Sequence, residues 1–433
     1  MLTVRLSWST WWVNWISLII NMYMLSKLPK SIQQYLIITG NYWVFTLTDG
    51  ALRMLAVLHF HGLGYTPLQI AMLFIFYELF GIITNLLGGW LGTVVGLNTT
   101  MNIGLALQVI ALSMLLVPAD MLSVFWVMMA QAVSGVAKDL NKMSAKSAIK
   151  LLVPSGADNK LYKWVALLTG SKNTLKGVGF FLGGVLLSQF GFHDGILSMV
   201  CLLLIVWVVS IFSLQSEMGK VTSKPKFKQL FSKRPAINCL SSARLFLFAA
   251  RDVWFVVALP VYLTSQLGWD YSHVGGVLAL WVIGYGVVQS LAPTLSGHRK
   301  AESQDGYRLF KWAVTLSAVP ALMAVALYSD VQEGAVLLAG LVVFGVLFAI
   351  NSSLHSYLIV SYAHRDAVSL DVGFYYMANA AGRLLGTVLS GWLYQNYNFE
   401  ICLWVSALFI FMSAIIAKAL PDKSTSVPVP LSA

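Results

Sequence analysis

The chain has 433 residues, of which 58% are hydrophobic and only 10% are charged, and its formal net charge is +11. Soluble proteins carry about 25% charged residues, so this composition, with a mean hydropathy of +0.76, excludes a soluble enzyme. It predicts an all-α integral membrane protein, because in lipid every backbone amide needs a partner within its own helix.

Apolar segments long enough to cross the roughly 30 Å hydrocarbon core recur along the whole chain. We expect twelve transmembrane helices, at residues 34–58, 67–91, 98–117, 121–141, 161–188, 194–213, 237–264, 271–293, 308–328, 334–355, 368–394 and 400–419. An even number of helices puts both termini on the same side of the bilayer.

Lysine and arginine are unevenly distributed between the two sets of connecting segments. The breaks at 59–66, 118–120, 189–193, 265–270, 329–333 and 395–399 contain neither. The other set holds nearly all of them: Lys27 and Lys30, Lys142 to Lys163, Lys220 to Arg234, Arg299 and Lys300. Basic residues near helix ends are retained in the cytoplasm. We therefore predict a multi-pass protein of the inner (plasma) membrane with both termini cytoplasmic, and no nucleic-acid partner.

Residues 1–33 precede the first predicted helix and form a cytoplasmic N-terminal segment. Its apolar stretch from Trp11 to Met24 has about 14 residues, which is short for a transmembrane span. Two interpretations stay open: an interfacial helix, or a segment upstream of a true start at Met22 or Met24.

The two halves of the sequence resemble each other. The predicted helix 161–188 contains Lys176-x-x-Gly179-x-x-x-x-Gly184, and the predicted helix 368–394 contains Arg383-x-x-Gly386-x-x-x-x-Gly391. The first helix of each half carries an acidic residue, Asp49 and Asp252, and precedes a matching turn, Leu63-Gly64-Tyr65 and Leu267-Gly268-Trp269. Internal repeats of this kind are typical of transporters, whose cargo site lies between the halves.

This repeat predicts the major facilitator fold. We expect a six-helix bundle at 34–213, a basic cytoplasmic linker at 214–236, a second six-helix bundle at 237–419 and a cytoplasmic tail at 420–433. One departure is the loop after the second helix, where that superfamily usually has Gly, an acidic residue and several Arg. This chain has Gly89-Trp90-Leu91-Gly92-Thr93-Val94-Val95-Gly96-Leu97-Asn98, so the salt bridges that form gates in typical members are not expected here.

Charged residues inside the predicted helices indicate the cargo. A charge at the bilayer centre costs roughly 2.5 to 3.5 kcal/mol, so these residues must face a polar cavity or one another. Their excess of positive charge predicts a multiply charged anion, which arginine binds bidentately. We predict six substrate-binding residues: Arg53, Lys172, Lys176, Arg244, Arg251 and Arg383. We predict three coupling or counter-ion residues: Asp49, Glu78 and Asp252.

Other interpretations of these charges stay open. Asp49 with Arg53, and Asp252 with Arg251 or Arg244, could instead be permanent structural pairs. Glu78 could be a proton carrier, a partner for a lysine or a packing residue. Four lysines spaced by four residues lie at the cytoplasmic end of the fourth helix: Lys138, Lys142, Lys146 and Lys150. We expect them to be solvated surface that sets the topology; the alternative is that they collect anions from the cytosol.

Signatures of enzyme chemistry do not occur in the sequence. It has no phosphate-binding Walker loop, and its cysteines, Cys201, Cys239 and Cys402, lie far apart without a C-x-x-C motif. We therefore expect no enzyme activity, no cofactor, no metal site and no structural disulfide.

Four segments are similar to the ArsJ-type organoarsenical efflux permeases, and the similarity extends from about residue 34 to about residue 415. They are Asn41-Tyr42-Trp43 with Thr48 to Arg53, Lys138 to Lys146, Lys163 to Lys172, and Ala250 to Phe255. The resemblance implies export of 1-arseno-3-phosphoglycerate by alternating access, and hence arsenate resistance. It also implies a functional link to a glyceraldehyde-3-phosphate dehydrogenase, which makes this ester from arsenate. The alternative is an organophosphate or sugar-phosphate antiporter, which the same basic residues would serve.

Overall fold

The computed structural model describes residues 28–63, 73, 75–118, 121–154, 156–214, 218–220, 234–269, 271–296, 305–329, 332–364 and 368–421. Most of the N-terminal segment, the centre of the basic linker and the C-terminal tail lie outside these residues, as do Arg299 and Lys300. The predictions made for those parts stay predictions.

Helices make up almost all of the described chain, and no strand occurs in it. The first half contains α2 (Lys30–Gly62), α4 (Ile75–Val95), α5 (Leu97–Ser113), α6 (Val124–Leu152) and α7 (Asp158–Ser213), with a short 3-10 turn at Met114–Leu116. The second half contains α8 (Pro235–Phe255), α9 (Ala258–Ser265), α10 (Tyr271–Leu295), α11 (Asp305–Leu327), α12 (Glu333–Tyr362), α13 (Val368–Asn396) and α14 (Phe399–Lys418).

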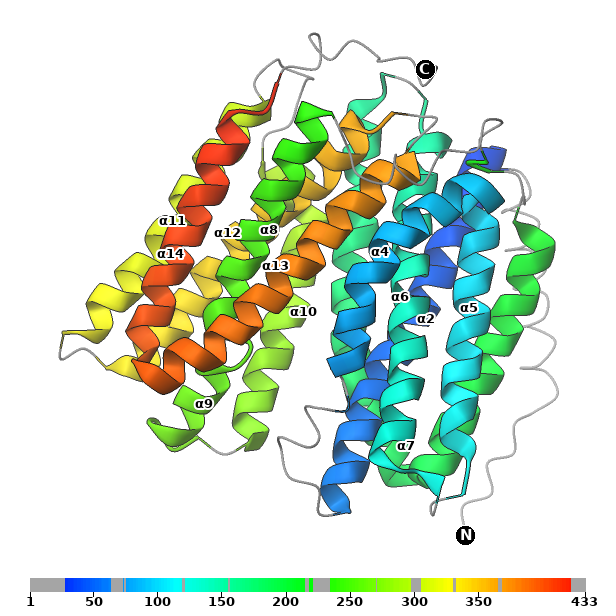
Figure 1. Ribbon diagram of the computed structural model, residues 1–433, viewed down its shortest axis with the longest axis horizontal. Helices are drawn as coiled ribbons and strands as arrows, with labels where there is room; N and C mark the ends of the chain where they lie inside the picture. Colours follow the sequence, from blue (N-terminus) through cyan, green and yellow to red (C-terminus); the bar gives the residue numbers. More distant parts are fainter. Residues whose placement is uncertain are drawn as a thin grey trace, which may run out of the picture.

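The long helix α7 contains two membrane crossings joined at a kink. Gly191 interrupts it with φ 76° and ψ −175°, a left-handed conformation that glycine adopts without steric cost. The α8 and α9 helices follow each other across a two-residue break and form one crossing. Counted in this way, the described helices make twelve crossings in two groups of six, which lie side by side (Figure 1). The predicted fold class is therefore confirmed.

Two helices extend well past their predicted ends. The α6 helix runs to Leu152 rather than to 141, and α12 runs to Tyr362 rather than to 355. Both extensions are rich in polar side chains that the fold buries, among them Lys146, Ser147 and Ser356. Hydropathy falls at such residues, so a prediction based on apolar runs ends the helix too early.

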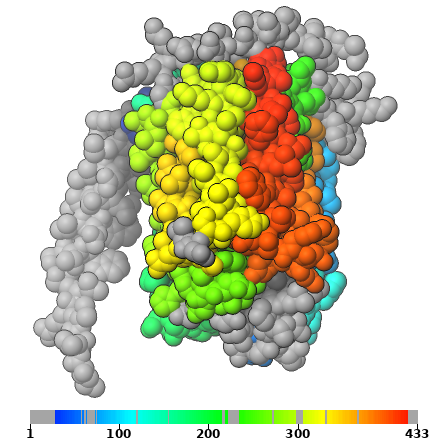
Figure 2. Space-filling model, turned by 90° about the vertical axis from the view of Figure 1, so that its left-hand side faces the viewer, coloured from blue at the N-terminus to red at the C-terminus, as the bar shows by residue number. Residues whose placement is uncertain are grey.

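By length and composition, eight helical stretches of the described chain are apolar enough to cross a membrane. The helices α2, α6 and α13 are not among these eight, because their many polar residues lower their mean hydropathy. The outer surface is apolar, with Phe212 85% and Leu322 67% exposed. Figure 2 shows α11 and α14 side by side on this surface, where Leu322 and Leu408 face outward. Such a surface suits contact with lipid chains.

The repeated glycines pack corresponding helices together in both halves. A Cβ atom on Gly179 of α7 would lie 2.5 Å from the carbonyl oxygen of Leu47 in α2. A Cβ atom on Gly386 of α13 would likewise lie 2.5 Å from the carbonyl oxygen of Ala249 in α8. Only glycine allows these close approaches, so the sequence repeat is also a packing repeat.

The two halves touch at the end of the molecule where α2, α7, α8, α11 and α13 begin, which we call the basic end. Here α4 crosses α13 (Figure 1), and the Oγ of Ser369 donates a hydrogen bond to the carbonyl oxygen of Gly89 at 2.7 Å. Tyr162 stacks on Tyr357 with ring centroids 4.7 Å apart. The loop expected from Gly89 onward is wrong, because α4 continues as a helix to Val95. Within α4, Gly89 makes a direct backbone contact with Ser369 and Gly373 of the other half, which closes the interface at this end.

Candidate cargo site

A cavity of about 290 Å³ lies between the two halves. Helices α2, α4, α6 and α7 line it from the first half, and α8, α10, α12 and α13 line it from the second. Its volume is close to the lower limit for small-molecule pockets, about 300 Å³. The position and size suit a small cargo held between two moving halves.

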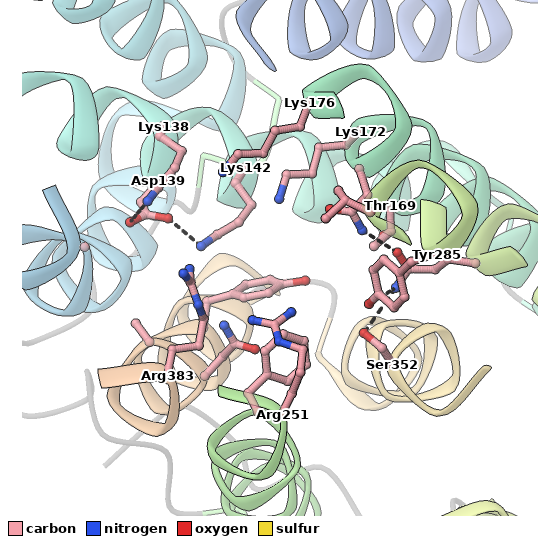
Figure 3. Close-up of a pocket in the computed structure, with 18 of the residues that line it drawn as sticks. Lys138, Asp139, Lys142, Thr169, Lys172, Lys176, Arg251, Tyr285, Ser352 and Arg383 are labelled. Carbon is pink, nitrogen blue, oxygen red and sulfur yellow. Dashed lines mark hydrogen bonds and ion pairs between the residues drawn. The ribbon is translucent and has the colours of Figure 1, made fainter. Parts of the chain in front are cut away.

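The lining of this cavity is strongly basic. Two carboxylates, Glu78 and Asp139, line it against eight cationic side chains. These are Lys138, Lys142, Lys146, Lys172, Lys176, Arg244, Arg251 and Arg383. All five lysines come from α6 and α7 and all three arginines come from α8 and α13. Figure 3 shows Lys142 and Lys172 on one side of the cavity and Arg251 and Arg383 on the other.

Three carboxylates neutralise part of this charge. Asp139 accepts a short hydrogen bond from Lys142 and lies 3.9 Å from Lys138. Asp252, which is fully buried behind the lining, pairs with the Nε of Arg251 at 2.6 Å and with the Nε of Arg383 at 3.3 Å.

Glu78 links the two halves. Its Oε1 accepts from Arg53 of the first half at 3.2 Å and from Arg383 of the second half at 3.3 Å. Since Arg383 also contacts Asp252, it bridges one acidic residue of each half. This network holds the halves together at the level of the cavity.

Four of the lining cations have no carboxylate partner among the described residues: Lys146, Lys172, Lys176 and Arg244. The Nζ of Lys146 makes a short hydrogen bond to the hydroxyl of Tyr376. Lys172 and Lys176 make neither a hydrogen bond nor an ion pair within the described chain.

Neutral groups hold Arg244 in place. It donates to the Oδ1 of Asn379 at 2.9 Å and to both the carbonyl oxygen and the Oγ of Ser352 at 3.1 Å. The guanidinium carbon of Arg244 lies over the ring of Phe248, 3.9 Å from the ring centroid. None of these neutral partners cancels the positive charge of Arg244.

The structure brings five of the six predicted cargo residues into one cavity: Lys172, Lys176, Arg244, Arg251 and Arg383. Arg53 is not among the lining residues and instead packs over the ring of Tyr77 at 4.1 Å while pairing with Glu78. Asp49 is also outside the lining and accepts a hydrogen bond from Tyr77 at 2.7 Å. Whether these residues bind cargo stays a prediction.

The expectation that the lysines following the fourth helix are solvated surface is wrong. Lys138, Lys142 and Lys146 line the cavity, and Lys146 is only 3% exposed. Lys150 donates to the carbonyl oxygen of Ser361 in the other half at 2.8 Å. Their spacing of four residues was the useful signal, because it places them on one face of a helix. It was missed because α6 was predicted to end at residue 141.

Asp252 does pair with Arg251, at 2.6 Å, and whether this pair is permanent or opens for cargo stays a prediction. For Arg53 the structure shows a partner on another helix, Glu78. None of the three cysteines is among the residues that line the cavity, and Cys402 is buried in the second half.

The fold and the central cavity define a membrane transporter built from two helical halves. The sequence matches the model of the Major Facilitator Superfamily over residues 36–387, and the chain belongs to this superfamily. No curated protein matches the sequence.

Solved structures resemble this one along nearly the whole chain. The proton:xylose symporter XylE, bound to 6-bromo-6-deoxy-D-glucose, has a TM-score of 0.71 at 13% identity, with 90% of this chain and 96% of that chain covered. The human organic anion transporter MFSD10 also has a TM-score of 0.71 at 13% identity, with 90% and 100% covered. A bacterial homologue of the iron transporter ferroportin, in an outward-facing state, has a TM-score of 0.68 at 14% identity, with 90% and 98% covered. At these identities the likeness shows the fold alone.

Proposed function

We propose that the protein exports a phosphorylated organoarsenical anion, 1-arseno-3-phosphoglycerate, by alternating access, and thereby confers arsenate resistance. The observation that supports an anionic cargo is the set of four cavity cations without a carboxylate partner. The arsenical part rests on the resemblance of the sequence to the ArsJ-type permeases. On this proposal, a glyceraldehyde-3-phosphate dehydrogenase supplies the cargo.

The charge of the empty cavity explains why an anion is the preferred cargo. Four uncompensated cations at membrane depth cost roughly 10 to 14 kcal/mol on insertion scales. A cargo with about three negative charges would offset most of this cost, whereas a neutral sugar would offset none. Binding therefore depends strongly on the charge of the cargo.

The ion pairs across the cavity suggest how cargo and conformation are linked. Arg383 contacts both Glu78 and Asp252. An arriving anion competes with these carboxylates for Arg383 and for Arg251, so the acids act as counter-ions that hold the arginines while the cavity is empty. The halves then turn about the cargo, and the contact of Gly89 with Ser369 at the basic end opens.

The proposal is tested in cells that lack other arsenate exporters. We expect growth in arsenate and low intracellular arsenic only when the chain and the dehydrogenase are expressed together. Lys176→Gln and Arg383→Gln should abolish protection at unchanged membrane levels. Lys163→Gln is the matched control, because Lys163 lies on the same helix as Lys176 but is exposed at its start.

Two outcomes would contradict the proposal. Protection without the dehydrogenase would mean that arsenate itself is the cargo. Failure to protect, combined with exchange of glycerol 3-phosphate for phosphate in vesicles, would establish the organophosphate antiporter instead.

A further inference from the structure

We infer that the cavity contains two anion subsites at different depths, so that the preferred cargo carries an anionic group at each of its two ends. This inference rests on the proposed function in one respect, namely that the cavity carries an organic anion. It does not depend on arsenic. The deep subsite lies toward the basic end and is formed by Lys146, Arg244 and Asn379. The outer subsite is formed by Lys172 and Lys176.

The deep subsite offers only hydrogen-bond donors. Two nitrogens of Arg244 are occupied by Asn379 and Ser352, while its Nη2 makes no hydrogen bond to a described residue. The Oδ1 of Asn379 is occupied by Arg244, which leaves the amide nitrogen of Asn379 as a donor. Lys146 supplies an ammonium whose bond to Tyr376 uses one of three protons. An acceptor with several oxygens, such as a phosphate, satisfies all three groups.

The fixed orientation of Arg244 strengthens this assignment. Its side chain is buried, at 3% exposure, and its partners are neutral, so they hold the guanidinium without cancelling its charge. Ser352 is fixed in turn by Gln289, whose Nε2 donates to the Oγ of Ser352 at 3.1 Å. A guanidinium held in this way binds an oxyanion with little loss of side-chain entropy.

The outer subsite is formed by two lysine ammonium groups and has no fixed guanidinium. Lys172 and Lys176 are one turn apart on α7, so their ammonium groups lie on the same face. Both line the cavity, and neither makes a hydrogen bond or an ion pair within the described chain; the ammonium of Lys176 lies 5.9 Å from the centroid of the Phe180 ring. Flexible ammonium groups bind anions of varied shape as point charges. This subsite should therefore be less selective for geometry than the deep one.

The two subsites lie at different distances from the basic end, where the halves touch. At about 1.5 Å per residue along each helix, the backbone of Lys146 lies about 9 Å from that end and that of Arg244 about 14 Å from it. The backbones of Lys172 and Lys176 lie about 21 and 27 Å from the same end. The backbones of the two subsites are therefore about 7 to 18 Å apart along the helices. Their lysine and arginine side chains extend into the same cavity, so a short carbon chain with an oxyanion at each end can reach both subsites. A cargo with one anionic group fills only one subsite.

The test is calorimetric titration of the purified full chain with three stable probes: propane-1,3-diyl bisphosphate, glycerol 3-phosphate and inorganic phosphate. We expect the bisphosphate to bind about 100-fold more tightly than glycerol 3-phosphate, because it gains a second set of charge-assisted hydrogen bonds. Arg244→Gln and Lys176→Gln should each reduce binding of the bisphosphate about 100-fold. Only one of the two should weaken glycerol 3-phosphate, since a single phosphate occupies one subsite.

Lys163→Gln should match the parent protein, and Arg244→Lys should restore part of the affinity, which shows that a loss in Arg244→Gln is not misfolding. Equal binding of the bisphosphate and glycerol 3-phosphate would overturn the inference. So would equal weakening of both probes by both variants. Loss of arsenate protection with the bisphosphate preference intact would refute the arsenical and leave the two subsites standing.

Discussion

Replacing Gly89 with alanine should shift the conformational equilibrium of the transporter away from the state described here. A Cβ atom at this position would lie 2.5 Å from the carbonyl oxygen of Ser369 and 3.1 Å from the Cα of Gly373. Both atoms belong to the backbone of α13, so neither can move aside as a side chain would. Overpacking of this kind costs about 1 to 3 kcal/mol. Since the cost applies only while the halves touch at the basic end, the closed state should become roughly 5- to 150-fold less favoured.

The assay follows the opening of the basic end directly. In a chain whose native cysteines are replaced, Ser369→Cys places a thiol at a buried position on α13 that contacts Gly89 of the other half. We expect a maleimide to label this thiol about 5- to 150-fold faster when Gly89→Ala is added, since labelling follows the open population while opening is rapid. Gly40→Ala is the control, because a Cβ atom there meets nothing within 4 Å. An equal labelling rate with and without Gly89→Ala would refute the argument that backbone contact holds the basic end closed.

Three further predictions concern charge, energetics and thiols. Lys146→Gln should reduce cargo affinity about 10- to 100-fold, because it removes a cation with no carboxylate partner; unchanged binding in a titration would show that the lysine only supports Tyr376. Export of an anion with charge about −3 should gain roughly 7 kcal/mol per 100 mV, so an imposed potential should drive efflux from vesicles while a pH gradient alone should not. Uphill efflux driven by pH and lost in Asp49→Asn would establish proton coupling instead. Replacing all three cysteines should leave arsenate protection unchanged, and its loss in a stably folded variant would point to a thiolate site.

Much of the fold could be predicted because the length and hydropathy of a membrane-spanning segment can be read from that segment alone. A membrane crossing needs about 20 predominantly apolar residues whatever surrounds it, so most of the helices could be predicted from composition and the two halves from their repeated glycines. The ends of α6 and α12 could not be found in this way. Their last turns are polar, and only the contact between the two halves makes a polar helical surface stable there.

The sequence by itself predicted which charged residues would share a polar cavity, and from them an anionic cargo. Charged residues within apolar helices must face one another or a polar space, and five of the six predicted cations do line one cavity. Their spacing on α7 and α8 was sufficient to place them on shared faces.

Only the tertiary structure decided which of these cations are paired with a carboxylate and which are not. Arg53, Arg251 and Arg383 are paired with acids on other helices or on the neighbouring residue, whereas Lys146, which had been assigned to the surface, lies in the cavity. The physical reason is that pairing depends on which helices face each other across the interface between the halves. Residues such as Glu78 and Arg383 are far apart in the sequence, and spacing along one helix carries no information about their contact.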